Sequence, residues 1–214
     1  MKITTTLLAV LAFGASAFGQ GQIRFQNRIT TAGLFAPVYG VNALAPTTPL
    51  RGQSSTNGGA VNYGTAPLLV GTGFTAALWA APAGTVDQNS LSFIQIATAG
   101  FHTAVTLPGI INGPTAAQTI PFASGEPNSG VPVAFQIRAW DNKVGQVTTW
   151  AAALADDTVA KGASAITTAN ANVSPLAAGP ITGLTSFNLT IVPEPGVIAL
   201  GVLGLGALLL RRRK

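Results

Sequence analysis

The residues that could carry out chemistry are few and lie far apart in this sequence. The 214 residues include no cysteine and a single histidine, His102. One histidine cannot build a two-histidine or three-histidine metal site, and no Gly-x-Ser-x-Gly motif marks a nucleophilic serine. We therefore interpret His102 as an ordinary strand residue. We expect no catalytic residue, no metal ligand and no cofactor, and hence a protein that is not an enzyme.

The adjacent carboxylates Asp156 and Asp157 could contribute to a calcium site together with backbone carbonyls. Calcium needs six to eight oxygen ligands, and no Asp-x-Asp-x-Asp loop supplies them here. We interpret the pair as a solvated turn. The five acidic residues between Gly21 and Thr190 are scattered, so they neither indicate nor exclude two carboxylates facing each other across a cleft.

Three tryptophans, Trp79, Trp140 and Trp150, are the other residues of interest. Extracellular β-sandwiches often bind sugars by stacking them on exposed aromatic rings. Trp79 and Trp140 lie opposite the main apolar rows of their predicted strands, so at least one could be exposed. A loop or helix can equally cover that face. We favour packing and keep sugar stacking as the alternative.

These residues must be positioned by short apolar stretches that Gly- and Pro-rich turns separate. The predicted strands span residues 21–27, 73–81, 91–97, 101–107, 118–123, 131–140, 144–150 and 186–192. Residues 40–66 are expected to form a long loop. Many short strands without a fixed repeat predict an all-β fold, a jelly-roll-like β-sandwich with one short helix.

The clearest strand is residues 131–140, where apolar and polar residues alternate with period two. We expect Phe135 and Ile137 to be buried in a central strand. Residues 144–150 are predicted to pair back on it as a hairpin. The short helix is predicted over residues 149–155, with Thr149 as its N-cap. In residues 21–27, Ile23 and Phe25 are expected to point inward.

Both ends of the chain have the features of targeting segments. At the N-terminus, Lys2 precedes an apolar run over residues 7–13 and then small residues. This predicts a signal peptide over residues 1–19 that is cleaved after Gly19, with cleavage after Ala17 as the alternative.

The C-terminus combines Pro193-Glu194-Pro195, an uncharged apolar run over residues 196–210, and the basic residues Arg211, Arg212, Arg213 and Lys214. As a helix, fifteen residues span about 22 Å, somewhat short of a hydrocarbon core of about 30 Å. A run this short can also be a buried core helix, but the four terminal cations favour a transmembrane helix. The positive-inside rule keeps them cytoplasmic.

This arrangement of motif, apolar run and basic end resembles the PEP-CTERM family of exported bacterial surface proteins. The resemblance implies that Pro193, Glu194 and Pro195 are the recognition element for an exosortase. Such a membrane enzyme is thought to cleave the tail and transfer the body to the cell envelope or exopolysaccharide matrix. The tail is also named for its occurrence on ice-binding proteins. Segments of the body, such as GFTAALWAAPAG and VAFQIRAWDNKVG, resemble uncharacterised PEP-CTERM proteins of Verrucomicrobia-like bacteria.

The net charge of +5 resides almost entirely in the two ends. Between Gly21 and Thr190, six basic residues oppose five acidic ones, which leaves +1. Binding to phosphates needs clustered cations, so we expect no nucleic-acid partner. Without cysteine there is no disulfide framework, and a hydrophobic core must stabilise the roughly 170-residue body.

We therefore expect three segments: a signal peptide over 1–19, a β-sandwich body over 20–191 and a sorting signal over 192–214. The expected function is that of an exported surface or matrix-associated protein of unknown biochemical activity. It would be membrane-anchored at first and would then reside on the cell surface or in the extracellular matrix. The alternative is a module that binds carbohydrate such as exopolysaccharide. Ice binding is a further alternative, but the threonines lack the regular spacing it requires.

Overall fold

The computed structural model describes residues 19–104 and 106–192. These residues form an all-β fold with one short α-helix, which confirms the predicted class. The strands are β1 (Gly19–Ile23), β2 (Arg28–Ile29), β3 (Leu34–Phe35), β4 (Val38–Tyr39), β5 (Phe74–Pro82), β6 (Ile94–Phe101), β7 (Ile111–Asn112), β8 (Gln118–Gly125), β9 (Gly130–Asp141), β10 (Lys161–Ala163), β11 (Thr167–Val173) and β12 (Phe187–Asn188). The helical elements are α2 (Trp150–Ala155) and the 3-10 helices η1 (Thr30–Ala32) and η2 (Ser55–Asn57).

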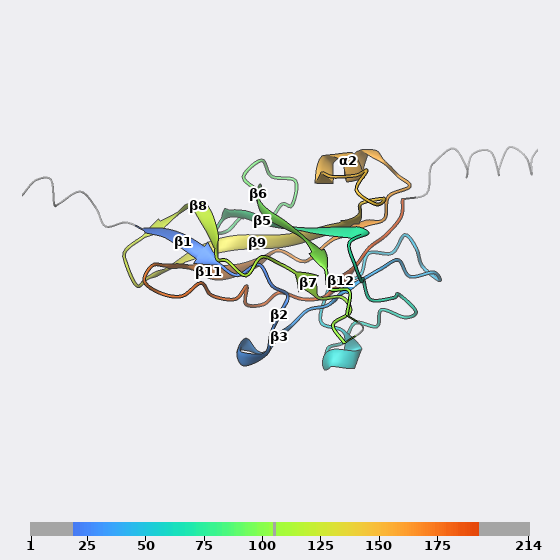
Figure 1. The fold of residues 1–214 in the computed structure, drawn as a ribbon, viewed down its shortest axis with the longest axis horizontal. Coiled ribbons are helices and arrows are strands. Elements are labelled where there is room, and N and C mark those ends of the chain that lie inside the picture. The colour runs from blue at the N-terminus through green and yellow to red at the C-terminus, as the bar shows by residue number, and fades with distance from the viewer. Residues whose placement is uncertain (1–18, 105, 193–214) are drawn as a thin grey trace, which may run out of the picture.

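Eight of the described strands form one curled sheet in the order β7-β6-β5-β9-β11-β1-β8, with β10 also paired to β9 (Figure 1). The pairings within this sheet are antiparallel. Two small sheets, β2-β3 and the parallel pair β12-β4, lie with irregular chain on the concave side in Figure 1. The main core lies between this layer and the large sheet.

Alternation along the central strand β9 explains the core. Its inward row of Val133, Phe135, Ile137 and Ala139 is at most 1% exposed, which confirms the predicted burial of Phe135 and Ile137. The inward row of β5 packs against it in the same cluster. Ile23 and Phe25 are fully buried there too, as predicted.

The outward row of β5 and β9 carries two smaller apolar clusters. Trp140 is fully buried with Val147, Ala153 and Val159, under the segment that contains α2, and its Nε1 donates to the carbonyl of Val147 at 2.8 Å. At the other end of the strands, Phe93 packs against small residues of β5 and β9. Between the two clusters the row continues with polar side chains, which form the site described below.

The helix begins where the sequence predicts. Thr149 has extended backbone dihedrals, and its Oγ1 accepts a hydrogen bond from the backbone N–H of Ala152 at 3.1 Å. This is N-capping geometry, in which a side-chain oxygen satisfies a free amide of the first turn.

The predicted hairpin over residues 144–150 is wrong, because β9 has no free edge to receive it. β5 occupies one edge of β9, and β10 and β11 occupy the other. The chain instead turns at Lys143 and Val144, both with positive φ, and crosses to the outer face of the sheet. The Trp140–Val147 hydrogen bond holds it there.

Several strand boundaries also differ from prediction. Strands predicted over 91–97 and 101–107 are replaced by the single strand β6, which begins at Ile94 and ends at Phe101. Leu91 is completely exposed in the preceding turn. The strand predicted over 186–192 is reduced to β12, and β10 and β11 were not predicted.

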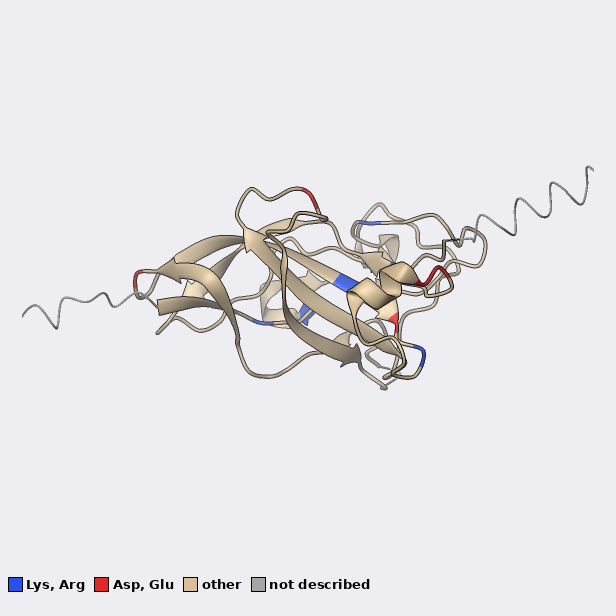
Figure 2. Cartoon of the chain, turned by 90° about the horizontal axis from the view of Figure 1, so that it is seen from above, with Lys and Arg blue, Asp and Glu red and all other residues tan. Residues whose placement is uncertain are grey.

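Charged residues are spread thinly over the body rather than gathered on one face (Figure 2). The body is elongated, and Figure 1 shows β1 starting at one end while the last described residues leave at the other. The two predicted targeting segments therefore adjoin opposite ends of the fold.

Candidate functional site

The candidate site lies on the outer face of the central sheet, where β9 carries Gln136 and Arg138. Both side chains are almost fully buried, at 1% and 7% exposed. A polar row here is what period-two alternation produces when the other face of the strand is the apolar core. It remains buried because the segment carrying α2 and the loop between β5 and β6 rise on either side.

Arg138 is surrounded by aromatic rings. Its guanidinium carbon lies 4.2 Å from the centroid of the Trp79 ring, 5.6 Å from that of Trp150 and 5.8 Å from that of Phe93. Burial lowers the pKa of Arg138 from its ordinary value. Among the described residues no carboxylate forms an ion pair with it, so the rings and neutral oxygens compensate its charge.

Hydrogen bonds from Arg138 hold the loop between β5 and β6 against the sheet. Its Nε donates to Oε1 of Gln136 at 2.8 Å, and its Nη2 donates to the backbone carbonyl of Gln88. Gln136 in turn donates through Nε2 to the carbonyl of Ser164 at 3.1 Å and to Oε1 of Gln88 at 3.4 Å. Gln88 is thus held by both its backbone and its side chain.

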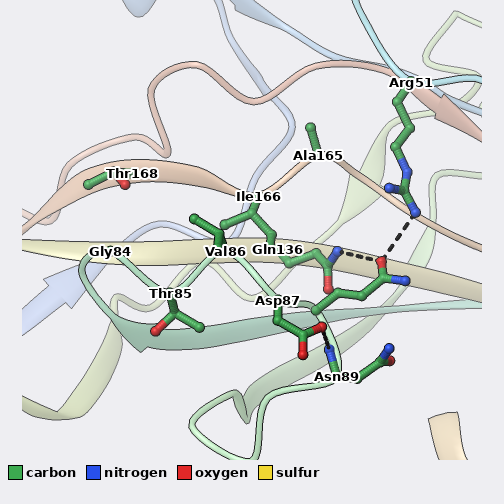
Figure 3. A pocket seen from close by; sticks show the side chains of 11 residues that line it. Arg51, Gly84, Thr85, Val86, Asp87, Asn89, Gln136, Ala165, Ile166 and Thr168 are labelled. Atoms are coloured by element: carbon green, nitrogen blue, oxygen red, sulfur yellow. Dashed lines mark hydrogen bonds between the residues drawn. The ribbon is translucent and has the colours of Figure 1, made fainter.

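Gln88 connects this buried network to Arg51, which is exposed. Arg51 donates from Nη2 to Oε1 of Gln88 at 3.2 Å and from Nε to the carbonyl of Ala163 at 2.9 Å. Arg51 and Gln136 thus both donate to Oε1 of Gln88, and dashed lines in Figure 3 mark these two hydrogen bonds at the labelled Arg51 and Gln136 side chains. Four segments distant in sequence therefore converge on one point.

Two adjoining hollows meet at this point, and both are lined by Arg51 and Gln88. The larger has a volume of about 510 Å³, and its other polar lining residues are Thr85, Asp87, Asn89, Gln136 and Thr168. The smaller has a volume of about 180 Å³ and is also lined by Trp150, Leu154, Lys161, Asn188 and Thr190. We call the two hollows together the Arg51 groove.

The composition of the Arg51 groove suits the binding of a polar ligand. The larger hollow falls in the size range of small-molecule sites. Among the described residues that line it, Asp87 is the one carboxylate, and it accepts the backbone N–H of Asn89 at 2.9 Å. The lining thus offers guanidinium, amide and hydroxyl groups, without the second carboxylate that glycoside hydrolysis requires.

The residues singled out from the sequence lie partly here and partly elsewhere. Trp140 is packed away, as predicted, whereas Trp79 and Trp150 are half-buried around Arg138. The buried Nε1 of Trp79 has no hydrogen-bond partner among the described residues. His102 lies just beyond β6, and its backbone pairs with Ile110 and Gly71.

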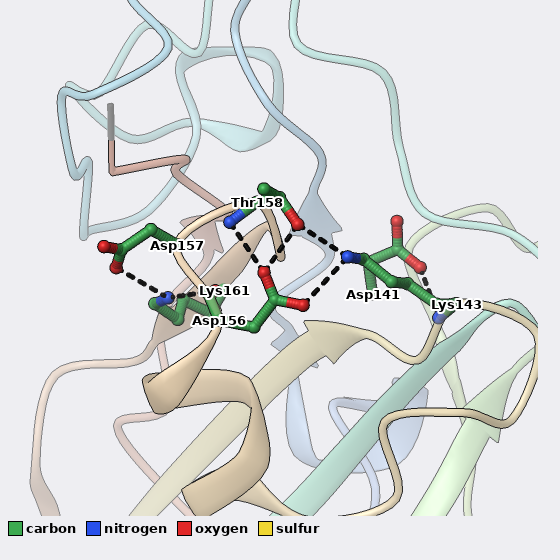
Figure 4. A network of polar contacts seen from close by, with 6 residues as sticks. All are labelled: Asp141, Lys143, Asp156, Asp157, Thr158 and Lys161. Carbon is green, nitrogen blue, oxygen red and sulfur yellow. Dashed lines mark hydrogen bonds and ion pairs between the residues drawn. The ribbon is translucent and has the colours of Figure 1, made fainter. Parts of the chain in front are cut away.

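Asp156 and Asp157 form a turn that is tied to nearby lysines (Figure 4). Asp156 accepts from Nζ of Lys143 at 2.9 Å, and Asp157 lies 4.0 Å from Nζ of Lys161. Hydrogen bonds from Thr158, followed by the one from Lys143, lower the pKa of Asp156 to about 2. Over residues 19–104 and 106–192, no three His, Asp or Glu side chains are grouped so as to hold a metal ion.

The sorting-signal residues Pro193, Glu194 and Pro195, the predicted membrane segment over 196–210, and the basic residues Arg211, Arg212, Arg213 and Lys214 lie outside the described residues. So does most of the predicted signal peptide. In the part of the chain that the structure describes, no helix has both the length and the apolar character needed to cross a bilayer.

The chain matches no protein-family model, no curated protein and no solved structure. Sequence reasoning did not find the Arg51 groove either. The one sequence feature that could have indicated the groove is the pair of polar residues Gln136 and Arg138 in the outward row of β9, because Trp79 lies beside Gln136 on the neighbouring strand β5. Arg51 and Gln88, in distant loops, gave no signal of their own.

Proposed function

We propose that this protein is an exported bacterial surface protein, sorted by its C-terminal tail to the cell envelope or extracellular matrix. The observation that carries the proposal is the tripartite tail: Pro193-Glu194-Pro195, the apolar run 196–210 and the basic residues 211–214. A signal peptide over 1–19 directs export, and residues 196–210 form a transmembrane helix with its basic end in the cytoplasm.

The body in this proposal is a jelly-roll-like β-sandwich. Its curled sheet and the irregular layer across the core support this architecture. The absence of cysteine and the low charged fraction of 8% suit an extracellular β-domain that is stabilised by its core alone. Because β1 begins at one end of the body and the chain leaves at the other, a tail held in the membrane would let the body project from it (Figure 1).

Two variants separate anchoring from recognition by an exosortase. Replacing Arg211, Arg212, Arg213 and Lys214 by neutral residues removes the cations that hold the helix end inside, so the apolar segment should slip through the membrane. Glu194→Gln changes neither the apolar length nor the basic end, so insertion should survive. In an exosortase-containing host, this variant should accumulate as an uncleaved membrane form, while the native protein is processed.

Mass spectrometry of the mature C-terminus in fractionated cells measures both effects. Equal processing of the native and Glu194→Gln proteins would remove Glu194 as a recognition residue. Release of the unprocessed native protein into the medium would contradict the membrane helix.

The Arg51 groove favours a second function for the body, the binding of carbohydrate. Carbohydrate ligands present many hydroxyls and apolar ring faces, and the groove combines amide and hydroxyl side chains with Trp150. A glycan array probed with the full-length chain tests this function. Trp150→Ala should weaken any binding that is seen, whereas Phe122→Ala, which removes a partly exposed aromatic ring from β8, outside the groove, should not.

A further inference from the structure

We infer that the Arg51 groove binds a polysaccharide that carries carboxylate groups, with Arg51 as the residue that contacts the carboxylate. The inference rests on the proposed carbohydrate-binding function and specifies the class of its ligand. Three features of the structure support it: the state of the Arg51 guanidinium, the balance of charge in the groove, and the way the two hollows join.

The guanidinium of Arg51 is oriented and yet available. Its two hydrogen bonds go to neutral oxygens, Oε1 of Gln88 and the carbonyl of Ala163. No carboxylate among the described residues pairs with it. A guanidinium has five N–H groups, so about three remain to donate to a ligand. Such a planar, pre-oriented fork matches the two oxygens of a carboxylate.

The charges around the groove also favour an anionic ligand. Arg51 and Lys161 line it, against the single carboxylate of Asp87 among the described lining residues. Arg138 lies beneath the floor and bonds to the same loop as Asp87. Lys161 is buried, donates to the backbone carbonyl of Asp156 at 2.8 Å and lies 4.0 Å from a carboxylate oxygen of Asp157, which offsets its charge. The exposed Arg51 has no such carboxylate partner among the described residues, so it is the lining cation that complements isolated negative charges on a ligand.

A chain-like ligand fits better than a small acid because the two hollows share Arg51 and Gln88. A ligand that passes from one hollow to the other must cross these two residues. On one side it meets hydroxyl and amide groups such as Thr85 and Asn89, and on the other it meets the ring of Trp150. Alternating polar contacts with an aromatic surface suit successive sugar rings.

Binding of the full-length chain to acidic oligosaccharides, measured by calorimetry in detergent, tests the inference. The probes are oligogalacturonate, alginate oligomers and hyaluronan oligomers, each beside its carboxyl-reduced, neutral form. We expect at least one acidic probe to bind and its reduced form to bind at least tenfold more weakly. Arg51→Gln should abolish this preference, and Arg51→Lys should retain only part of it because the ammonium lacks the fork.

Arg24→Gln is the matched control, because Arg24 is an exposed arginine that does not line the groove. It should bind like the native chain. The basic residues 211–214 are the same in every variant, so differences between variants report the groove. Thermal unfolding of Arg51→Gln should match that of the native chain, which shows that any lost affinity is not lost folding.

Three results would overturn the inference. Equal affinity for the acidic and the reduced probes would show that the carboxylate is not recognised, although the groove would still bind carbohydrate. Failure of every acidic probe to bind would exclude acidic polysaccharides as ligands of the groove. The glycan array would then decide separately whether neutral sugars bind. A DNA oligonucleotide bound with the same dependence on Arg51 would show general attraction of polyanions.

Discussion

The position of β1 inside the sheet leads to a prediction that a single methyl group can test. β1 lies between β11 and β8, and its Gly21 is opposite residues of both neighbours. A Cβ added at Gly21 would lie 2.7 Å from the Cβ of Ala171 and 3.2 Å from that of Ala123. The first distance is too short for two carbon atoms, so Gly21→Ala must displace a strand.

The expected cost follows from two opposing terms. Overpacking a filled core costs about 1–3 kcal/mol, whereas replacing Gly by Ala in a strand returns about 0.5–1 kcal/mol. The two terms together give a net loss of about 0–2.5 kcal/mol in the free energy of unfolding. The 2.7 Å contact with the Cβ of Ala171, in a paired neighbouring strand, favours the upper part of this range, about 1–2.5 kcal/mol. Ala171→Gly removes the opposing methyl group, so the double variant should lose at least about 1 kcal/mol less than the sum of the two single variants.

Urea denaturation of the full-length chain, followed by tryptophan fluorescence, measures these changes. Trp140 is fully buried, so its emission reports loss of the folded body. An unchanged midpoint for Gly21→Ala, or strictly additive effects in the double variant, would show that β1 is not packed against β11. The N-terminal strand would then lie outside the sheet. In the structure, Gly19 is the first residue of β1 and pairs with Gly125, so the predicted cleavage after Gly19 falls inside the strand, whereas the alternative after Ala17 precedes it.

Two further predictions concern the core and the acid response. Phe135→Ala should lower the free energy of unfolding by about 3–5 kcal/mol, because Phe135 is fully buried in the central strand β9. A loss below about 1 kcal/mol in the same urea assay would contradict that placement. Thr158 and Lys143 lower the pKa of Asp156 to about 2, so its carboxylate stabilises the fold above about pH 4 and loses this effect as the pH falls toward 2. Asp156→Asn should therefore flatten the loss of stability between about pH 4 and pH 2, and an unchanged pH profile would argue against these contacts.

Local patterns in the sequence determined the parts of the fold that depend on nearest neighbours. The alternation along residues 131–140 predicted the buried row of β9, because one side of a strand must face the core. Thr149 predicted the start of the helix, because an N-cap acts on amides only two or three residues away.

Tertiary structure alone decided which edges of β9 were free and which residues met on its outer face. The strand β11 escaped prediction because its inward residues include Ala169 and Ala171, whose small side chains give a weak β signal. The hairpin over 144–150 failed because β10 and β11, later in the chain, take the edge it needed.

The Arg51 groove shows the same limit most clearly. Arg51, Gln88 and Arg138 are separated by 37 and 50 residues in sequence, and they meet only through hydrogen bonds at Gln88. Each is an ordinary polar residue in its own segment, so no local pattern marks it. Their convergence depends on long-range strand pairing, which places the loop between β5 and β6 beside β9 and the segment that follows β10. The sequence alone therefore predicted the core strand, which the structure confirms, and the targeting ends, which remain predictions because they lie almost entirely outside the described residues. Only the tertiary structure brought the residues of the groove together.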